Sequence, residues 1–160
     1  LLIFIKIFLI KFLFFLLLIS LIDIYFITMN IKSSKELVEQ ANETINVMTP
    51  EEVKKAYEKG EVTLIDVRDI RELWKEGTIK DSIHIPRGML EFWLDPQSSY
   101  YQEKKIGSLK KIVLFCALGF RSALATKSLK EMGFTNVANA QGGFDSLKSI
   151  GMPLIAKEKK

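Results

Sequence analysis

The feature that most constrains the fold is a stretch in which a buried strand gives way directly to a helix. Residues 111–115 are an apolar run with the length and β-branched content of a buried strand. After Arg121 the apolar residues recur at helical spacing, as Ala125, Leu129 and Met132. Strand and helix patterns alternate along most of the chain. We therefore predict an α/β fold with a mostly parallel central sheet flanked by helices.

The single cysteine of the chain, Cys116, lies between this strand and this helix. Parallel sheets bind ligands beyond the carboxyl ends of their strands. The free N–H groups and the dipole of a following helix favour the nucleophilic thiolate. Arg121 adds a permanent cation, and Gly119 allows a tight turn. A lone cysteine is most often a small buried hydrophobic residue, so the prediction of a reactive thiol depends on this context.

The remaining elements are predicted from periodicity, turn residues and caps. Thr49, Pro50 and Glu52 predict a helix start with a capping box. The segment 95–108 is expected to be a loop beside Cys116 that shapes the substrate entrance, or else a solvated loop with packed tyrosines. The other expected strands are 45–48, 62–67, 83–85 and 135–138, and the other expected helices are 30–44, 70–75, 87–93, 121–132 and 144–150.

Three polar residues stand at strand ends. Asp66 and Arg68 are expected to tie the end of their strand to neighbouring loops, with a catalytic role for Asp66 as the alternative. His84 is the one histidine of the chain, and we expect its ring to bond locally. A Cys–His pair with Cys116 is the alternative. One histidine and one cysteine argue against a structural zinc site, so no metal is expected.

Residues 1–28 differ in composition from the rest of the chain, since they consist almost entirely of Leu, Ile and Phe. The stretch is long enough to span a bilayer of about 30 Å, despite Lys6, Lys11 and Asp23. A signal peptide is a second interpretation, although no small-residue cleavage site follows. A third is that residues 1–28 are upstream sequence read in frame and that Met29 is the start.

Composition narrows the classes of function. The 160 residues suffice for one domain with an appendage, and one cysteine excludes an internal disulfide. The formal net charge of +4 comes largely from scattered lysines and the charged tail 157–160. Because no basic stripe alternates with aromatic residues, we expect no nucleic-acid partner. The mildly basic balance suits an anionic substrate.

Four motifs in register resemble the single-domain rhodanese family, over residues 45–154. They are Leu64-Ile65-Asp66-Val67-Arg68 with Glu72, Ile83-His84-Ile85-Pro86, Cys116-Ala117-Leu118-Gly119-Phe120-Arg121-Ser122, and Gly142-Gly143-Phe144. The resemblance implies a rhodanese-like fold and a thiosulfate sulfurtransferase activity without a cofactor. It also implies a small anionic sulfur donor and a thiol or cyanide acceptor.

The same resemblance assigns roles within the loop. Cys116 would carry the sulfur as a persulfide, and Arg121 would stabilise the donor or the persulfide. The backbone of the remaining loop residues would bind substrate; these are Ala117, Leu118, Gly119, Phe120 and Ser122. Asp66, Arg68 and Glu72 would have structural roles.

Two other activities stay open. One is a non-catalytic sulfur-binding or redox-sensing module with an oxidisable Cys116. The other is a Cys-dependent phosphatase or arsenate reductase. Those phosphatases have five residues between Cys and Arg, whereas four separate Cys116 from Arg121.

The predicted organisation has four parts. A hydrophobic segment (1–28) precedes an amphipathic helical lead-in (29–44), a rhodanese-like domain (45–156) and a charged tail (157–160). If residues 1–28 are translated, the protein is anchored to a membrane, and Lys6 and Lys11 favour a cytoplasmic N-terminus. If Met29 is the start, the protein is cytoplasmic and has no membrane partner.

Overall fold

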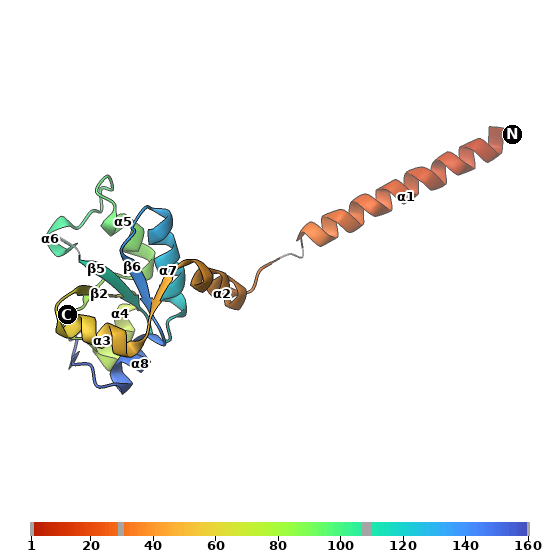
Figure 1. The fold of residues 1–160 in the computed structure, drawn as a ribbon. Coiled ribbons are helices and arrows are strands. Elements are labelled where there is room, and N and C mark those ends of the chain that lie inside the picture. The colour runs from red at the N-terminus through yellow and green to blue at the C-terminus, as the bar shows by residue number, and fades with distance from the viewer. Residues whose placement is uncertain (1, 29–30, 107–109, 160) are drawn as a thin grey trace. The chain divides into compact units, whose positions relative to one another are not determined.

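A computed structural model describes residues 2–28, 31–106 and 110–159. The chain divides into two compact units, residues 1–34 and 35–160. Helix α1 (Leu2–Thr28) belongs to the first unit (Figure 1). The later elements are α2 (Ser34–Thr44), β1 (Asn46–Met48), α3 (Pro50–Glu58), β2 (Val62–Asp66), α4 (Ile70–Glu76), β3 (Thr78–Ile79), β4 (Ile83–His84), the 3-10 helix η1 (Arg87–Met89), α5 (Leu90–Leu94), α6 (Glu103–Ile106), β5 (Lys111–Phe115), α7 (Phe120–Glu131), β6 (Val137–Ala140), α8 (Gly143–Ser149) and β7 (Leu154–Ile155).

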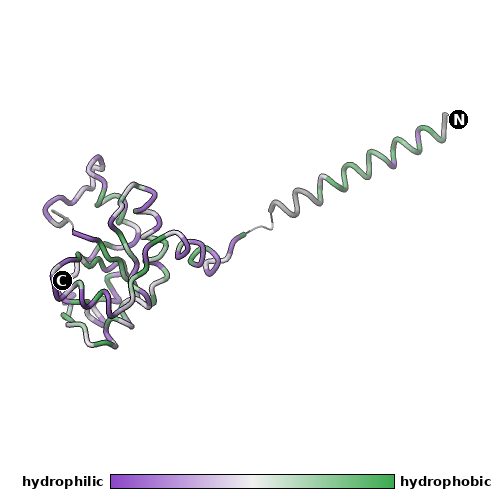
Figure 2. Tube along the Cα trace, viewed as in Figure 1, coloured by the Kyte–Doolittle hydropathy of each residue, from purple (hydrophilic) through white to green (hydrophobic). Residues whose placement is uncertain are grey.

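Apart from Lys6, Lys11 and Ser20, the described side chains of helix α1 are apolar on all sides, and Figure 2 shows the helix as mostly hydrophobic. Its residues Phe4–Leu21 form a stretch of 18 residues that is long and apolar enough to cross a membrane. None of that stretch is buried within the structure. By length and composition, α1 therefore has the character of either a membrane span or a signal sequence.

The second unit is built on a parallel five-stranded sheet. Its strand order is β1-β6-β5-β2-β4, and every neighbouring pair is parallel. β5 is central and pairs with β2 over its whole length, from Lys111 opposite Val62 to Phe115 opposite Asp66. The predicted α/β architecture with a mostly parallel sheet is confirmed.

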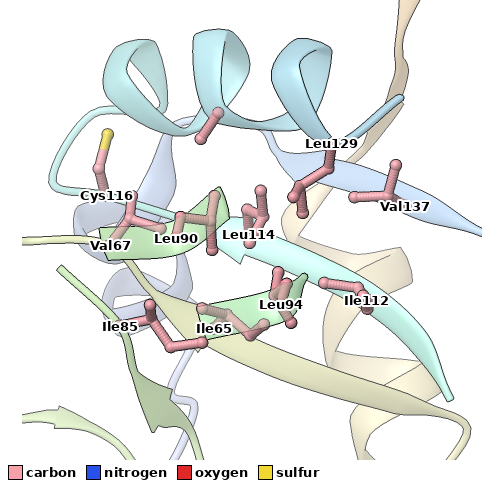
Figure 3. Close-up of a cluster of buried hydrophobic side chains, with 11 residues drawn as sticks. Ile65, Val67, Ile85, Leu90, Leu94, Ile112, Leu114, Cys116, Leu129 and Val137 are labelled. Carbon is pink, nitrogen blue, oxygen red and sulfur yellow. The ribbon is translucent and has the colours of Figure 1, made fainter. Parts of the chain in front are cut away.

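Apolar side chains project from both faces of the sheet. This is expected for a parallel sheet that helices cover on both faces. Along β5, Ile112 and Leu114 pack with α5 and α7, whereas Val113 and Phe115 pack with α3 and α8. Cys116 continues the first set. Figure 3 shows it at one end of that cluster, beside Val67 and Leu90.

Local sequence signals explain several helix starts. Thr49 caps α3, and its reciprocal bonds with Glu52 form the predicted capping box. Asp69 and Glu72 form a second capping box at α4 that was not predicted. Farther upstream, α2 packs on α7 through Val38 and Ala41.

Two local predictions are wrong. β6 occupies Val137–Ala140, two residues later than expected. The expected loop 95–108 contains α6. β3 pairs in antiparallel fashion with β7, which the sequence did not predict. Two-residue strands are too short to show periodicity.

Candidate active site

Cys116 lies just beyond β5, where the chain turns into the N-terminus of α7. Its side chain is buried, with 1% exposed. The Ser122 hydroxyl donates a hydrogen bond to the Cys116 Sγ at 3.5 Å. The first N–H groups of α7 have no partners within the helix, so the sulfur lies at the positive end of the α7 dipole. The order of elements thus brings the thiol, a hydroxyl donor and the first N–H groups of a helix together.

The first residues of α8 hold the loop 116–119 through backbone hydrogen bonds. Phe144 N–H donates to the Cys116 carbonyl at 2.7 Å, and Asp145 N–H donates to the Ala117 carbonyl at 3.2 Å. A Cβ built on Gly143 would lie 2.3 Å from the Cys116 carbonyl oxygen. Gly143 also has a φ of +59°, which side chains rarely adopt. Only glycine fits here, and the Cys116 and Ala117 carbonyls are held by the N–H groups of α8.

β6 supplies a further contact through Asn139, which is 3% exposed. Its Nδ2 donates to the Gly119 carbonyl at 3.2 Å, whereas its Oδ1 has no partner among the described residues. Sequence reasoning missed Asn139 and the close approach of Gly143. A polar residue within an otherwise apolar strand is the signal that could have identified Asn139.

Arg121 is held by Glu72. Two bonds join the groups, Arg121 Nη1 to Glu72 Oε2 at 2.6 Å and Nη2 to Oε1 at 2.8 Å. The hydrogen bond with Arg121 is the main cause that lowers the pKa of Glu72. The same bond raises the pKa of Arg121, and the nearby Cys116 adds to this rise. The structure therefore brings Arg121 and Cys116 together, with Glu72 as the third member.

Asp66 and Arg68 form a fully buried pair. Arg68 Nε lies 3.1 Å from both carboxylate oxygens of Asp66, and Arg68 Nη2 donates to Asp66 Oδ2 at 2.9 Å. Arg68 also bonds Glu76 and the Gly77 carbonyl, and lies 3.8 Å above the centre of the Phe144 ring. The pair thus links the end of β2 to α4 and α8.

The side chains of Asp66 and His84 form hydrogen bonds with groups other than the Cys116 sulfur. Asp66 Oδ2 also accepts from the Thr78 hydroxyl at 2.7 Å, so both of its oxygens have protein donors. His84 Nε2 donates to the Arg68 carbonyl at 2.9 Å. These contacts are the local ones expected of structural residues, and the pairing of His84 with Cys116 finds no support in them.

The segment after α5 does not lie beside Cys116. α5 runs from Leu90, near Cys116, to Leu94, near Ile112 (Figure 3). Figure 1 shows the chain from α5 through α6 at the end of the sheet from which β5 starts. For residues 95–106 the prediction that they shape the substrate entrance is wrong, because the helix that precedes them points toward the opposite end. Residues 107 and 108 of that prediction lie outside the described residues.

No metal site is evident in the described part of the chain. Across residues 2–28, 31–106 and 110–159, no group of three His, Cys, Asp or Glu side chains could hold a metal ion. The groups that meet at Cys116 can bind an anion through hydrogen bonds and a cation. They suit nucleophilic sulfur chemistry.

Comparison with known proteins gives consistent matches. The family model described as "Rhodanese-like domain" matches residues 49–150. A sulfurtransferase of Allochromatium vinosum is 26% identical over 98 residues, which are 61% of this chain and 82% of the relative.

Two solved structures add to this comparison. A Rhodopseudomonas palustris protein of unknown function, described as a possible tyrosine phosphatase, superposes with a TM-score of 0.73 at 38% identity, covering 78% of this chain and 95% of its own. The homodimeric polysulfide-sulfur transferase of Wolinella succinogenes superposes with a TM-score of 0.59 at 34% identity, covering 77% of this chain and 87% of its own.

Proposed function

Because this chain belongs to the rhodanese-like domain family, we propose that it is a sulfurtransferase that carries sulfur as a persulfide on Cys116. The observation that carries the proposal is the position of the Cys116 sulfur, which is buried at the N-terminus of α7 and accepts a hydrogen bond from the Ser122 hydroxyl. The names of two relatives, a sulfurtransferase and a polysulfide-sulfur transferase, support it.

The reaction has two steps. The Cys116 thiolate attacks the outer sulfur of a donor such as thiosulfate, a new S–S bond forms, the S–S bond of thiosulfate breaks, and sulfite leaves with the electron pair. A thiol or cyanide then attacks the outer sulfur of the persulfide and releases the Cys116 thiolate. No metal or organic cofactor takes part.

The loop residues have separate roles in these steps. The backbone N–H groups of Ala117, Leu118, Gly119, Phe120 and Ser122 hold the anionic persulfide. Arg121 stabilises the donor or the persulfide by charge-assisted hydrogen bonds. Asp66, Arg68 and Glu72 do not react and serve to hold the loop.

Intact-protein mass spectrometry tests the proposal. The full chain in detergent micelles should gain one sulfur atom after thiosulfate treatment and lose it to cyanide, and Cys116→Ser should gain none. A folded parent with a free thiol and no adduct, after thiosulfate and then polysulfide, would overturn the proposal. It would favour the binding or redox-sensing module, in which Cys116→Ser leaves cellular sulfur handling unchanged.

A phosphatase is the second candidate because of the description of the R. palustris neighbour. The spacing of four residues between Cys116 and Arg121 argues against it, since the ring is small for a tetrahedral phosphate. Hydrolysis of para-nitrophenyl phosphate, lost in Cys116→Ser, would establish this second activity. We expect the parent to hydrolyse para-nitrophenyl phosphate no faster than Cys116→Ser does.

We also propose that α1 anchors the protein to a membrane. Its stretch Phe4–Leu21 has the required length and composition. The full chain should remain with the membrane fraction after an alkaline carbonate wash, and a chain starting at Met29 should not. Recovery of a soluble protein that lacks residues 1–28 would favour a signal peptide or a start at Met29.

A further inference from the structure

A polar side chain interrupts the apolar face of β6 that α7 covers. Asn139 pairs in register with Leu114 of β5, whose side chain packs with α5 and α7. Val137, two residues earlier on the same face of β6, packs in the same cluster. Asn139 is 3% exposed, and its Oδ1 accepts no hydrogen bond in the part of the chain that the structure describes. A buried oxygen without a donor costs stability, so packing alone does not explain an asparagine at this position.

The Nδ2 group of Asn139 has a specific partner at the start of α7. It donates to the Gly119 carbonyl at 3.2 Å, and the same carbonyl accepts from the Ala123 N–H at 3.1 Å. Gly119 also lies close to the end of β6, because a Cβ built on it would be 3.3 Å from the Ala140 carbonyl oxygen. The turn that precedes α7 is therefore held against β6 by close packing and by a side-chain hydrogen bond.

The Gly119 carbonyl and the Phe120 N–H belong to the same peptide group. In a planar trans peptide, the C=O and N–H bonds point in opposite directions. Phe120 is the first residue of α7, so its N–H has no partner within the helix and points out of the N-terminal end. The Cys116 sulfur lies at that end, where it accepts from Ser122. A bond that holds the Gly119 carbonyl toward β6 therefore also sets the direction of the Phe120 N–H.

We propose that Asn139 is a positioning residue, which aims the Phe120 N–H at the sulfur that Cys116 transfers. This inference rests on the proposed function, in which the loop amides hold the anionic persulfide. Donors that are oriented in advance stabilise charge as it develops in the transition state, and a donor whose direction is free does so less well. Asn139 acts through the peptide group that joins Gly119 to Phe120.

Folding and sulfur transfer should respond differently to the loss of this amide. Asn139→Leu keeps the branched shape of the side chain and removes both of its polar atoms. The Gly119 carbonyl keeps its bond from the Ala123 N–H, so the substitution leaves no buried acceptor without a donor. We therefore expect the midpoint of urea denaturation to equal or exceed that of the parent.

Single-turnover kinetics on the full chain in detergent micelles measure the effect on sulfur transfer. Persulfide formation is followed by intact-protein mass spectrometry over a range of thiosulfate concentrations. Asn139→Leu should lower the rate at saturating thiosulfate about tenfold and change the half-saturating concentration by less than about twofold, because the interaction is made in the transition state. Asn139→Ala, which adds no bulk, should show the same split if the leucine variant does not fold.

Thr126→Val is the matched control. Thr126 is also buried, and its hydroxyl donates to the Ser122 carbonyl of α7 at 2.8 Å. The peptide group of that carbonyl carries the Ala123 N–H, which is already bonded to the Gly119 carbonyl. Loss of the Thr126 hydroxyl therefore redirects no free amide, and the saturating rate should stay within about twofold of the parent.

Each of the other results would count against the inference. A parent that loads sulfur and an Asn139→Leu variant that loads it as fast would overturn the positioning role alone, whereas a parent that does not load would overturn the proposed function as well. Equal losses in Asn139→Leu and Thr126→Val would assign the effect to the packing of α7. A change confined to the half-saturating concentration would assign Asn139 to donor binding. Failure of both Asn139 variants to fold would make the amide a requirement of the fold and not of the sulfur site.

Discussion

Glu72 and Arg121 are 49 positions apart in the sequence and form a two-pronged ion pair with bonds of 2.6 and 2.8 Å. Glu72 Oε2 also accepts from the Asp69 N–H at 3.0 Å, within the capping box of α4. The Glu72 carboxylate is therefore held by a hydrogen bond within its own helix, in addition to its bonds to Arg121. Glu72 positions the guanidinium next to Cys116 and has a more specific place than the general structural role predicted for it.

Glu72→Gln should lower kcat/KM for sulfur transfer from thiosulfate to cyanide about tenfold, because a displaced guanidinium no longer meets the sulfur correctly. The free energy of unfolding should fall by only about 0.5 kcal/mol, since the pair is partly exposed and screened. Steady-state kinetics and urea denaturation measure the two effects. Glu72→Asp, which keeps the charge, should recover part of the activity.

Arg71→Gln is the matched control for that experiment. Arg71 forms a similar ion pair with Asp69 on the same helix, and it is well exposed. We expect kcat/KM within twofold of the parent. A loss as large as that of Glu72→Gln would mean that α4 as a whole, and not the contact with Arg121, supports the reaction.

Acid should destabilise the protein through the same helix. Arg121 lowers the pKa of Glu72, and the hydrogen bond from Arg71 lowers the pKa of Asp69 to about 2. Groups with lowered pKa values contribute stability above their unfolded pKa, which is lost as the pH falls through the folded value. The free energy of unfolding should therefore decline between about pH 4.5 and pH 2. Urea denaturation at several pH values should show a smaller decline for Glu72→Gln.

The central elements could be predicted because their signals are local. β5 is rich in β-branched and aromatic residues, which favour strands. Thr49 and Glu52 form a capping box that marks the start of α3. The candidate site at Cys116 was inferred from the order of strand, cysteine and helix, and the roles of its residues stay predictions. These inferences need no knowledge of distant neighbours.

The parts that failed depend on distant contacts or weak local signals. β6 contains Ala and Asn139, which have low strand propensity, and its pairing with β5 defines it as a strand. β3 exists because β7 returns beside it from the C-terminal end. The bond between Glu72 and Arg121 likewise joins helices that only the folded sheet brings together.

Arg68→Met should destabilise the fold strongly, because it leaves the carboxylate of Asp66 buried and without its charge partner. We expect a loss of about 3–5 kcal/mol in the free energy of unfolding, measured by urea denaturation. The double variant Asp66→Leu/Arg68→Met removes both charges and should be more stable than Arg68→Met. Equal stability of the two would show that lost packing on Phe144, and not the unpaired charge, causes the effect.

Gly143, the first residue of α8, leaves no room for a side chain against the loop of Cys116. Gly143→Ala introduces a Cβ 2.3 Å from the Cys116 carbonyl oxygen at a backbone φ of +59°. Gly151 supplies a matched control, because its φ of +76° imposes a similar strain but nothing lies within 4 Å of its added Cβ. Gly151→Ala should cost about 1 kcal/mol of unfolding free energy and leave persulfide formation intact. Gly143→Ala should cost about 3 kcal/mol and abolish the persulfide in intact-mass measurements, since the loop must shift. If both variants lose the same stability and both still load sulfur, the contact with α8 does not set the position of Cys116.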